Sequence, residues 1–186
     1  LHNYVDLFTD SNFLASVGRS IAMSIIPIIV TIVIVLLALF VTAIYFPKLE
    51  KYVQIICMIP YTIQGVILSV SILSLYVGSS SILSNRLVML MGAYCIVILP
   101  YIYQGIRNGM RAVNMPTLIE AAEMLGASKI YAFFRVVVPN ILSAIIVSSL
   151  LAVGIIFGDY VLIRNLAGTS APNMQIFLYQ TMKSDS

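Results

Sequence analysis

Long uncharged apolar stretches alternate along the chain with short charged segments. Residues 20–47 hold no charged side chain, and residues 52–85 hold none either, although Gly-Ser-Ser-Ser at 78–81 marks a turn. A helix of about 20 apolar residues crosses the hydrocarbon core of a bilayer. The pattern therefore predicts an all-α, polytopic transmembrane helical bundle, a single domain over 1–186 that is a fragment of a longer protein. Its four visible spans are 20–47, 53–77, 87–106 and 136–158.

The segment 107–135 differs from the stretches around it because it holds four basic and two acidic residues. It is therefore expected as a loop, and its basic residues fall on the same face of the membrane as Lys48 and Lys51. Short loops rich in Lys and Arg stay on the cytoplasmic side. We therefore expect the loop 107–135 in the cytoplasm and residues 159–186 outside, in a multi-pass protein of the cell (inner or plasma) membrane.

The composition agrees with a membrane protein and excludes several other classes. The chain is 61% hydrophobic and 9% charged, whereas soluble domains carry roughly 25% charged residues. A net charge of +3, dispersed along the chain, does not indicate a nucleic-acid partner. The sequence has no phosphate-binding Gly-x-x-x-x-Gly-Lys-Ser/Thr motif and no Cys/His cluster, so we expect no catalytic residue, metal or cofactor.

Two short helices joined at a glycine are predicted for residues 116–139, which we call the elbow. Thr117 followed by Glu120 is a capping box and predicts that the first helix begins at Thr117. Gly126 can take the left-handed conformation that ends a helix, and Ser128 can cap the next one. The elbow is thus expected to present a compact knob to the cytoplasm.

The elbow sequence also resembles a known motif. Glu-Ala-Ala at 120–122, Gly126 after three intervening residues, and Val-x-Val-Pro at 136–139 are similar to the "EAA" loop of the permease subunits of ATP-binding-cassette (ABC) importers. Leu-Pro-Tyr at 99–101 and Met-Ile-Pro at 58–60 agree with the family's pattern. Val replaces Ile and Leu in the last part of the motif, which keeps its aliphatic character.

The resemblance implies a type I ABC importer permease that works by alternating access and is not itself an enzyme. Its partners would be cytoplasmic ATP-binding cassette ATPase subunits, a second permease subunit of the same or a paralogous chain, an extracytoplasmic substrate-binding protein and the lipid bilayer. The ATPase-coupling residues carried over from the motif are Glu120, Ala121, Ala122, Gly126 and Pro139. From the residues alone, an amphipathic helix lying on the bilayer surface is the alternative.

Three polar residues in or beside the spans are candidates for the substrate path: Asp159, Gln64 and Tyr101. Asp159 could instead cap a turn or pair with Arg164, and Gln64, like Gln104, could be an interhelical hydrogen-bond partner. The stretch 157–168 resembles permeases of the polyamine, ferric-iron and phosphonate group, so a polyamine is one possible cargo.

Two further expectations concern other functions and the rest of the protein. An ion-coupled secondary transporter is the alternative function, and it would need acidic residues or unwound helices within the spans. A six-span subunit would need one more span before Leu1 and one after Ser186. Gly154 and Gly158 form a Gly-x-x-x-Gly pair that would allow another helix to approach closely.

Overall fold

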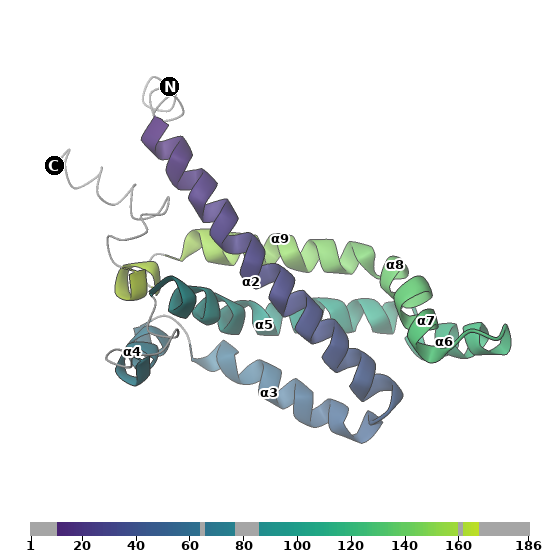
Figure 1. The fold of residues 1–186 in the computed structure, drawn as a ribbon. Coiled ribbons are helices and arrows are strands. Elements are labelled where there is room, and N and C mark those ends of the chain that lie inside the picture. The colour runs from purple at the N-terminus through teal and green to yellow at the C-terminus, as the bar shows by residue number, and fades with distance from the viewer. Residues whose placement is uncertain (1–10, 64–65, 77–85, 160–161, 168–186) are drawn as a thin grey trace.

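The computed structural model describes residues 11–63, 66–76, 86–159 and 162–167 (Figure 1). Every element in these ranges is a helix, which confirms the all-α fold. Two of the helices, over Leu14–Ile44 and Val88–Ala112, are long and apolar enough to cross a membrane. Counting each of two bent helix pairs as one span raises the number within the described ranges to four.

The helix α2 (Ser11–Ile44) runs obliquely across α5 and α9 (Figure 1). It contains Pro27 and several buried hydroxyl groups. The Ser20 hydroxyl donates to the Ser16 carbonyl at 2.9 Å, and the Ser24 hydroxyl donates to the Ser20 carbonyl at 2.7 Å. The hydroxyl groups of Ser20 and Ser24 are therefore satisfied within their own helix, as the apolar interior requires.

The second predicted span is occupied by two helices. The short turn η1 (Pro47–Leu49) leads into α3 (Glu50–Thr62), and α4 (Val66–Tyr76) follows. The stretches Pro47–Thr62 and Ile67–Ser74 are bent by 100° relative to each other. The uncharged run 53–77 thus contains a sharp change of direction that hydropathy alone does not reveal.

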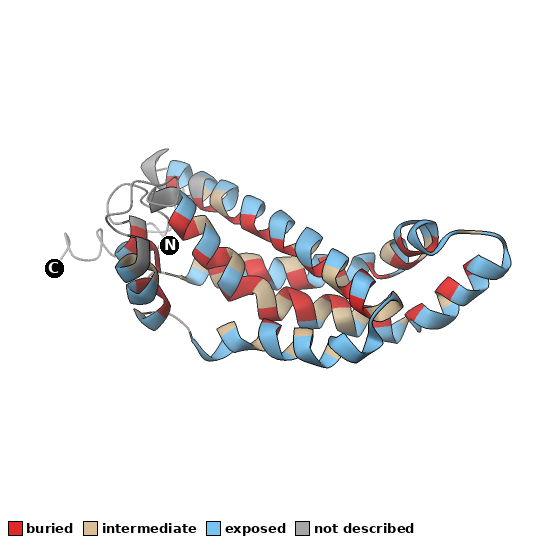
Figure 2. Ribbon diagram, turned by 60° about the horizontal axis from the view of Figure 1, so that its bottom comes forward, coloured by how far each residue is buried: buried red, intermediate tan, exposed pale blue. Residues whose placement is uncertain are grey.

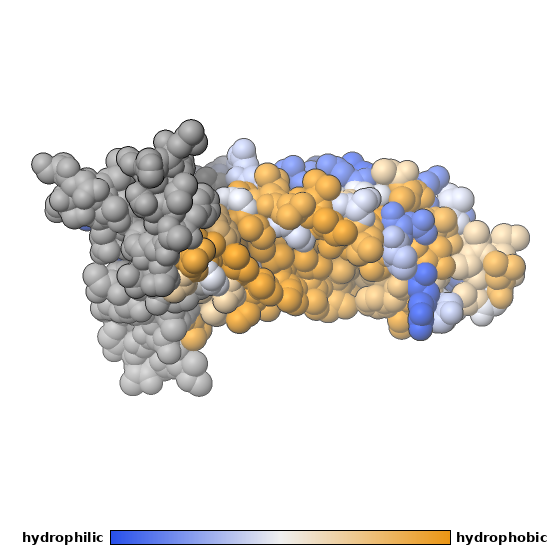
Figure 3. Space-filling view, turned by 90° about the horizontal axis from the view of Figure 1, so that it is seen from above, coloured by the Kyte–Doolittle hydropathy of each residue, from blue (hydrophilic) through white to orange (hydrophobic). Residues whose placement is uncertain are grey.

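The helix α5 (Arg86–Ala112) lies at the centre of the bundle and contacts α2, α3 and α9. Its inward positions recur every three or four residues, as expected for one helical face. The buried residues on this face include Leu90, Tyr94, Ile98, Ile102 and Ile106. Exposed residues cover the outside of the bundle (Figure 2), and an apolar belt covers much of the face seen in Figure 3.

Beyond α5 the chain forms the elbow and then returns along the bundle. The elements are α6 (Met115–Met124), α7 (Lys129–Ala132), the π-helical turn η3 (Phe133–Val137), α8 (Val138–Asn140) and α9 (Leu142–Gly158), followed by the π-helical turn η4 (Ile163–Ala167). The stretch Lys129–Asn140 is bent by 65° from α9. The elbow therefore stands at one end of the bundle (Figure 1).

The helices α5 and α9 approach each other closely at a pair of glycines. A Cβ atom added to Gly105 would lie 2.5 Å from Ser148 Cβ, and one added to Gly109 would lie 2.6 Å from Ala144 Cβ. Gly105 and Gly109 are a Gly-x-x-x-Gly pair, so this contact is the small-residue packing that such a pair permits. By contrast, Cβ atoms added to the predicted pair Gly154 and Gly158 would meet nothing within 4 Å.

Candidate functional site

The first helix of the elbow begins earlier than its capping box predicts. The N-cap of α6 is Asn114, whose φ of 50° is left-handed, and the helix starts at Met115. Thr117 therefore lies inside the first turn, and the prediction that the helix begins there is wrong. Pro116 explains the difference, because proline has its φ fixed near the helical value and favours the first helical positions.

The end of the same helix is built as predicted. Gly126 has φ +87°, its amide donates to the Glu123 carbonyl at 2.9 Å, and the Ala127 amide donates to the Ala122 carbonyl at 3.0 Å. This pair of bonds is the Schellman arrangement, which satisfies the last carbonyls of a helix. The Ser128 hydroxyl then accepts a bond from the Tyr131 amide at 3.3 Å and caps α7. The predicted roles of Gly126 and Ser128 in ending and starting these helices are confirmed.

The elbow has a buried side and an apolar tip. Ile119 and Ala122 are buried against the rest of the chain, whereas Ala121 is exposed. Met124 and Leu125, which we call the elbow tip, are 89% and 90% exposed. The tip lies next to the Schellman turn, so its two large apolar side chains project from a locally well-defined backbone.

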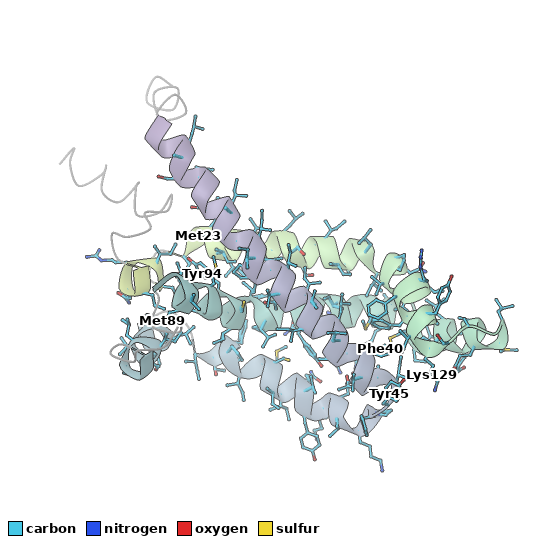
Figure 4. All side chains as sticks on the ribbon, in the orientation of Figure 1. Met23, Phe40, Tyr45, Met89, Tyr94 and Lys129 are labelled. Carbon is cyan, nitrogen blue, oxygen red and sulfur yellow. The ribbon has the colours of Figure 1, made fainter. Side chains whose placement is uncertain are left out.

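Charged groups surround the tip. Glu120 and Glu123 are exposed on α6, and Lys129 Nζ lies 3.9 Å from Glu123 Oε1. Glu120, Glu123 and Lys129 also line a small cavity between the elbow and the end of α2. Figure 4 shows Lys129 near Phe40, at the end of α2, and Tyr45, which follows that helix. This part of the elbow therefore combines an apolar tip with exposed charges of both signs.

The second part of the elbow, Lys129–Asn140, which we call the return limb, is shaped by Pro139. Proline has no amide hydrogen, so the usual i→i−4 bond is lost at this position. Val138 instead donates to the Phe133 carbonyl, which gives the π-helical turn η3, and the Asn140 side-chain amide donates to the Val136 carbonyl at 2.8 Å. Pro139 itself is exposed. Its position thus accounts for the bend between the elbow and α9.

Two ring contacts hold the return limb against α2. The centroids of Phe40 and Phe133 are 4.8 Å apart, and those of Phe40 and Phe134 are 6.2 Å apart. Phe133 is fully buried. Aromatic pairs at these separations add to the hydrophobic contribution of burial. The position of the elbow relative to the bundle is therefore fixed partly by α2.

Tyr101 lies in an open groove between α5 and α9. The groove has a volume of about 520 Å³ and is within the size range of small-molecule sites. Its polar lining includes Tyr101, Gln104, Asn108, Asn140 and Ser143. The sequence analysis missed Asn108, Asn140 and Ser143 as a group. The available signal was their polarity beside the predicted span ends, but only the crossing of α5 and α9 brings them together.

Gln104 and Asp159 each make a contact that bears on its predicted role. Gln104 Nε2 is 3.1 Å from Met58 Sδ, so this side chain does link α5 to α3. Asp159 Oδ1 accepts a bond from the Leu162 amide at 3.1 Å, in agreement with the predicted role as a turn cap. Asp159 follows α9 directly, at the opposite end of that helix from the elbow (Figure 1). Gln64 lies outside the described residues.

No metal-binding cluster of three or more His, Cys, Asp or Glu side chains occurs in the part of the chain that the structure describes.

The sequence matches the family model described as "Binding-protein-dependent transport system inner membrane component" over residues 48–183. This match covers well over half of the chain, and it includes α5, the elbow and α9. No curated protein matches the chain.

Proposed function

The chain belongs to the family of binding-protein-dependent transport system inner membrane components, which are permease subunits of ABC importers, and we propose that its elbow docks on a separate cytoplasmic ATPase subunit. In this proposal Glu120 and Ala121 are part of the docking surface, and Gly126 forms the turn beside it. Ala122 and Pro139 act from behind that surface, by packing the elbow and setting its angle.

The exposed elbow tip is the observation that supports docking best. Large apolar side chains are rarely left in water as a contiguous pair on a well-defined turn unless a partner covers them. The tip projects beyond the end of the bundle (Figure 1), and hydrophilic residues lie between the apolar belt and the elbow in Figure 3. A helix adsorbed on the bilayer would instead lay its apolar face along the membrane surface. The geometry therefore favours a cytoplasmic protein partner.

We further propose that the groove between α5 and α9 faces the translocation path or the second permease subunit. Amide and hydroxyl groups within a membrane are expensive to expose to lipid, so a polar groove is expected to face water or protein. Tyr101 is the predicted path residue that lies in this groove. Alternating access would then open the groove to one side of the membrane at a time, with cargo delivered by an extracytoplasmic binding protein.

The class of the cargo stays a prediction based on resemblance. A polyamine would be attracted by an acidic residue at the outer end of α9, where Asp159 lies. Asp159 Oδ1 also accepts the turn bond from the Leu162 amide. Replacing Asp159 by Asn keeps the bond and removes the charge, so its effect on uptake would separate the two roles.

The alternative function, an ion-coupled secondary transporter, would need ionisable groups at depth in the membrane. The stretches 20–47, 52–85, 87–106 and 136–158 contain no Asp, Glu, Lys, Arg or His. The permease proposal needs no such group, because a partner subunit supplies the energy.

Two elbow variants test the proposal. Gly126→Val should disrupt the Schellman turn, because a β-branched residue is strongly disfavoured at φ +87°. Glu120→Lys should reverse a charge on the exposed side of α6. We expect both full-length permeases to reach the membrane at near-normal levels, to lose uptake and to co-purify poorly with the ATPase.

Gly92→Val is the matched control, because Gly92 is exposed on α5 and a Cβ atom there would meet nothing within 4 Å. It should keep ATPase co-purification and uptake. Normal uptake and normal ATPase co-purification in both elbow variants would overturn the proposal that the elbow docks on the ATPase.

A further inference from the structure

Three charged side chains meet where α3 begins and α5 ends. Arg107 Nη2 and Nε lie 2.8 and 2.9 Å from the same carboxylate oxygen, Oε1 of Glu50. Arg111 Nη2 lies 3.5 Å from that oxygen. We call these three residues the Glu50 cluster.

The burial of the cluster distinguishes it from an ordinary surface ion pair. The Arg107 side chain is only 15% exposed and that of Glu50 is 34% exposed, whereas Arg111 is 61% exposed. Exposed ion pairs contribute little because water screens them. The pair of Arg107 and Glu50 is different, because the guanidinium is mostly buried and two of its nitrogens contact the same carboxylate oxygen. Removing either side chain would leave the charge of the other poorly compensated. The bond between Glu50 and Arg107 is therefore the strong link of the cluster.

The cluster also lies at a mechanically important place. Arg107 is in the last turns of α5, and α5 leads through Asn114 directly into the first helix of the elbow. Glu50 is the first residue of α3, the half of the bent pair that packs more extensively against α5. On the other side, the contact of Phe40 with Phe133 attaches the return limb to α2. The elbow is thus connected to α2 by an apolar contact and, through the end of α5, to α3 by an ionic one.

We propose that Glu50 is a positioning residue for coupling. Through Arg107 it fixes the end of α5 to the start of α3, so that a displacement of the elbow also moves the bent α3–α4 pair. This inference rests on the proposed docking of the ATPase on the elbow. It goes further because it assigns a role to residues outside the elbow and names the helix pair that receives the motion.

The test uses the full-length permease in complex with its ATPase, reconstituted in lipid nanodiscs. ATP hydrolysis is measured with and without the purified binding protein of the same transport system. Glu50→Gln and Arg107→Gln should reduce the stimulation by the binding protein by about tenfold, a typical size for coupling between distant sites. ATPase co-purification should stay at the wild-type level, because the elbow tip is unchanged.

Lys51→Gln is the matched control. Lys51 is the exposed neighbour of Glu50, and this substitution removes one charge, as Glu50→Gln and Arg107→Gln do. It should keep the wild-type stimulation. The double variant Glu50→Arg/Arg107→Glu restores a pair of opposite charges and should recover much of the stimulation. Stimulation within about twofold of wild type in both single variants, well short of typical coupling effects, would overturn the inference. So would an equal loss in the Lys51 control.

Arg107→Lys is a second variant that keeps the inference testable if the neutral variant Arg107→Gln does not fold. Lysine keeps the charge but not the forked geometry, so this variant should accumulate and show a stimulation reduced by about two- to threefold. The inference would be contradicted if Arg107→Lys kept the full stimulation of ATP hydrolysis while Arg107→Gln failed to accumulate in the membrane. The pair of Glu50 and Arg107 would then serve folding alone. Failure of the proposed docking looks different, because the elbow variants Gly126→Val and Glu120→Lys would then co-purify normally with the ATPase.

Discussion

The close crossing of α5 and α9 predicts a specific response to one added methyl group. In Gly109→Ala the new Cβ would lie 2.6 Å from Ala144 Cβ. Non-bonded carbon atoms prefer a separation of about 3.5–4.0 Å, so the two helices must move apart by about 1 Å or strain their backbones. Gly154→Ala is the natural comparison, because its new Cβ would meet nothing within 4 Å.

The expected magnitude follows from two opposing effects. Overpacking typically destabilises a protein by about 1–3 kcal/mol. Replacing glycine by alanine within a helix favours folding by roughly 1 kcal/mol. The second effect is common to both variants, so the difference between Gly109→Ala and Gly154→Ala isolates the packing effect. We expect Gly109→Ala to be the less stable variant by about 1–3 kcal/mol.

The assay is equilibrium unfolding of the purified full-length permease in mixed micelles, with the free energy of unfolding measured for each variant. The double variant Gly109→Ala/Ala144→Gly exchanges the two residues across the contact and leaves helix propensity nearly constant. It should therefore recover most of the lost stability. Equal stability of Gly109→Ala and Gly154→Ala, or no recovery in the double variant, would refute the close crossing.

Three further predictions concern the orientation of the chain and the two helix caps of the elbow. With Cys57 and Cys95 replaced, a single cysteine at Arg86 should react with an impermeant thiol reagent in intact cells and one at Lys129 should not; the reverse result would contradict the predicted topology. Ser128→Ala should raise hydrogen exchange across α7, because a lost N-cap destabilises a helix by about 0.5–2 kcal/mol. Thr117→Ala should leave exchange at the start of α6 unchanged, because Asn114 occupies the N-cap there; an increase would restore the capping-box prediction.

Local signals predicted the elbow well because short-range geometry determines it. Gly126 ends a helix through its own backbone freedom, and Ser128 caps the next through a bond three residues away. The start at Thr117 failed because Pro116 and Asn114 favour an earlier beginning. Neighbouring signals can thus compete, and the sequence pattern alone does not rank them.

The crossing of α5 and α9 was not predicted for a different reason. Hydropathy ends the third span at residue 106, just before Arg107, and this predicted end of the span separates Gly105 from Gly109. The helix continues to Ala112 instead. Charge does not break the backbone hydrogen bonds of a helix, and here Glu50 compensates Arg107. That compensation comes from residues 57 positions apart in the sequence, which no local pattern reports.

The bend between α3 and α4 shows the same limit. The uncharged run that contains both helices predicts a single span of sufficient length, but length and apolarity do not specify direction. The two helices are bent by 100° relative to each other, and this bend allows α3 to pack along α5 while α4 contacts η4. Tertiary packing, rather than composition, decides this part of the structure.

Photo-cross-linking from the elbow tip tests the central claim most directly. A benzophenone amino acid replaces Leu125 in the full-length permease, expressed with its ATPase and binding protein, and Tyr52 at the start of α3 is the control position. Docking of the elbow predicts a cross-linked product between the permease and the ATPase from position 125 and little or none from position 52. Absence of that product from position 125, with lipid or the permease itself captured instead, would contradict the account.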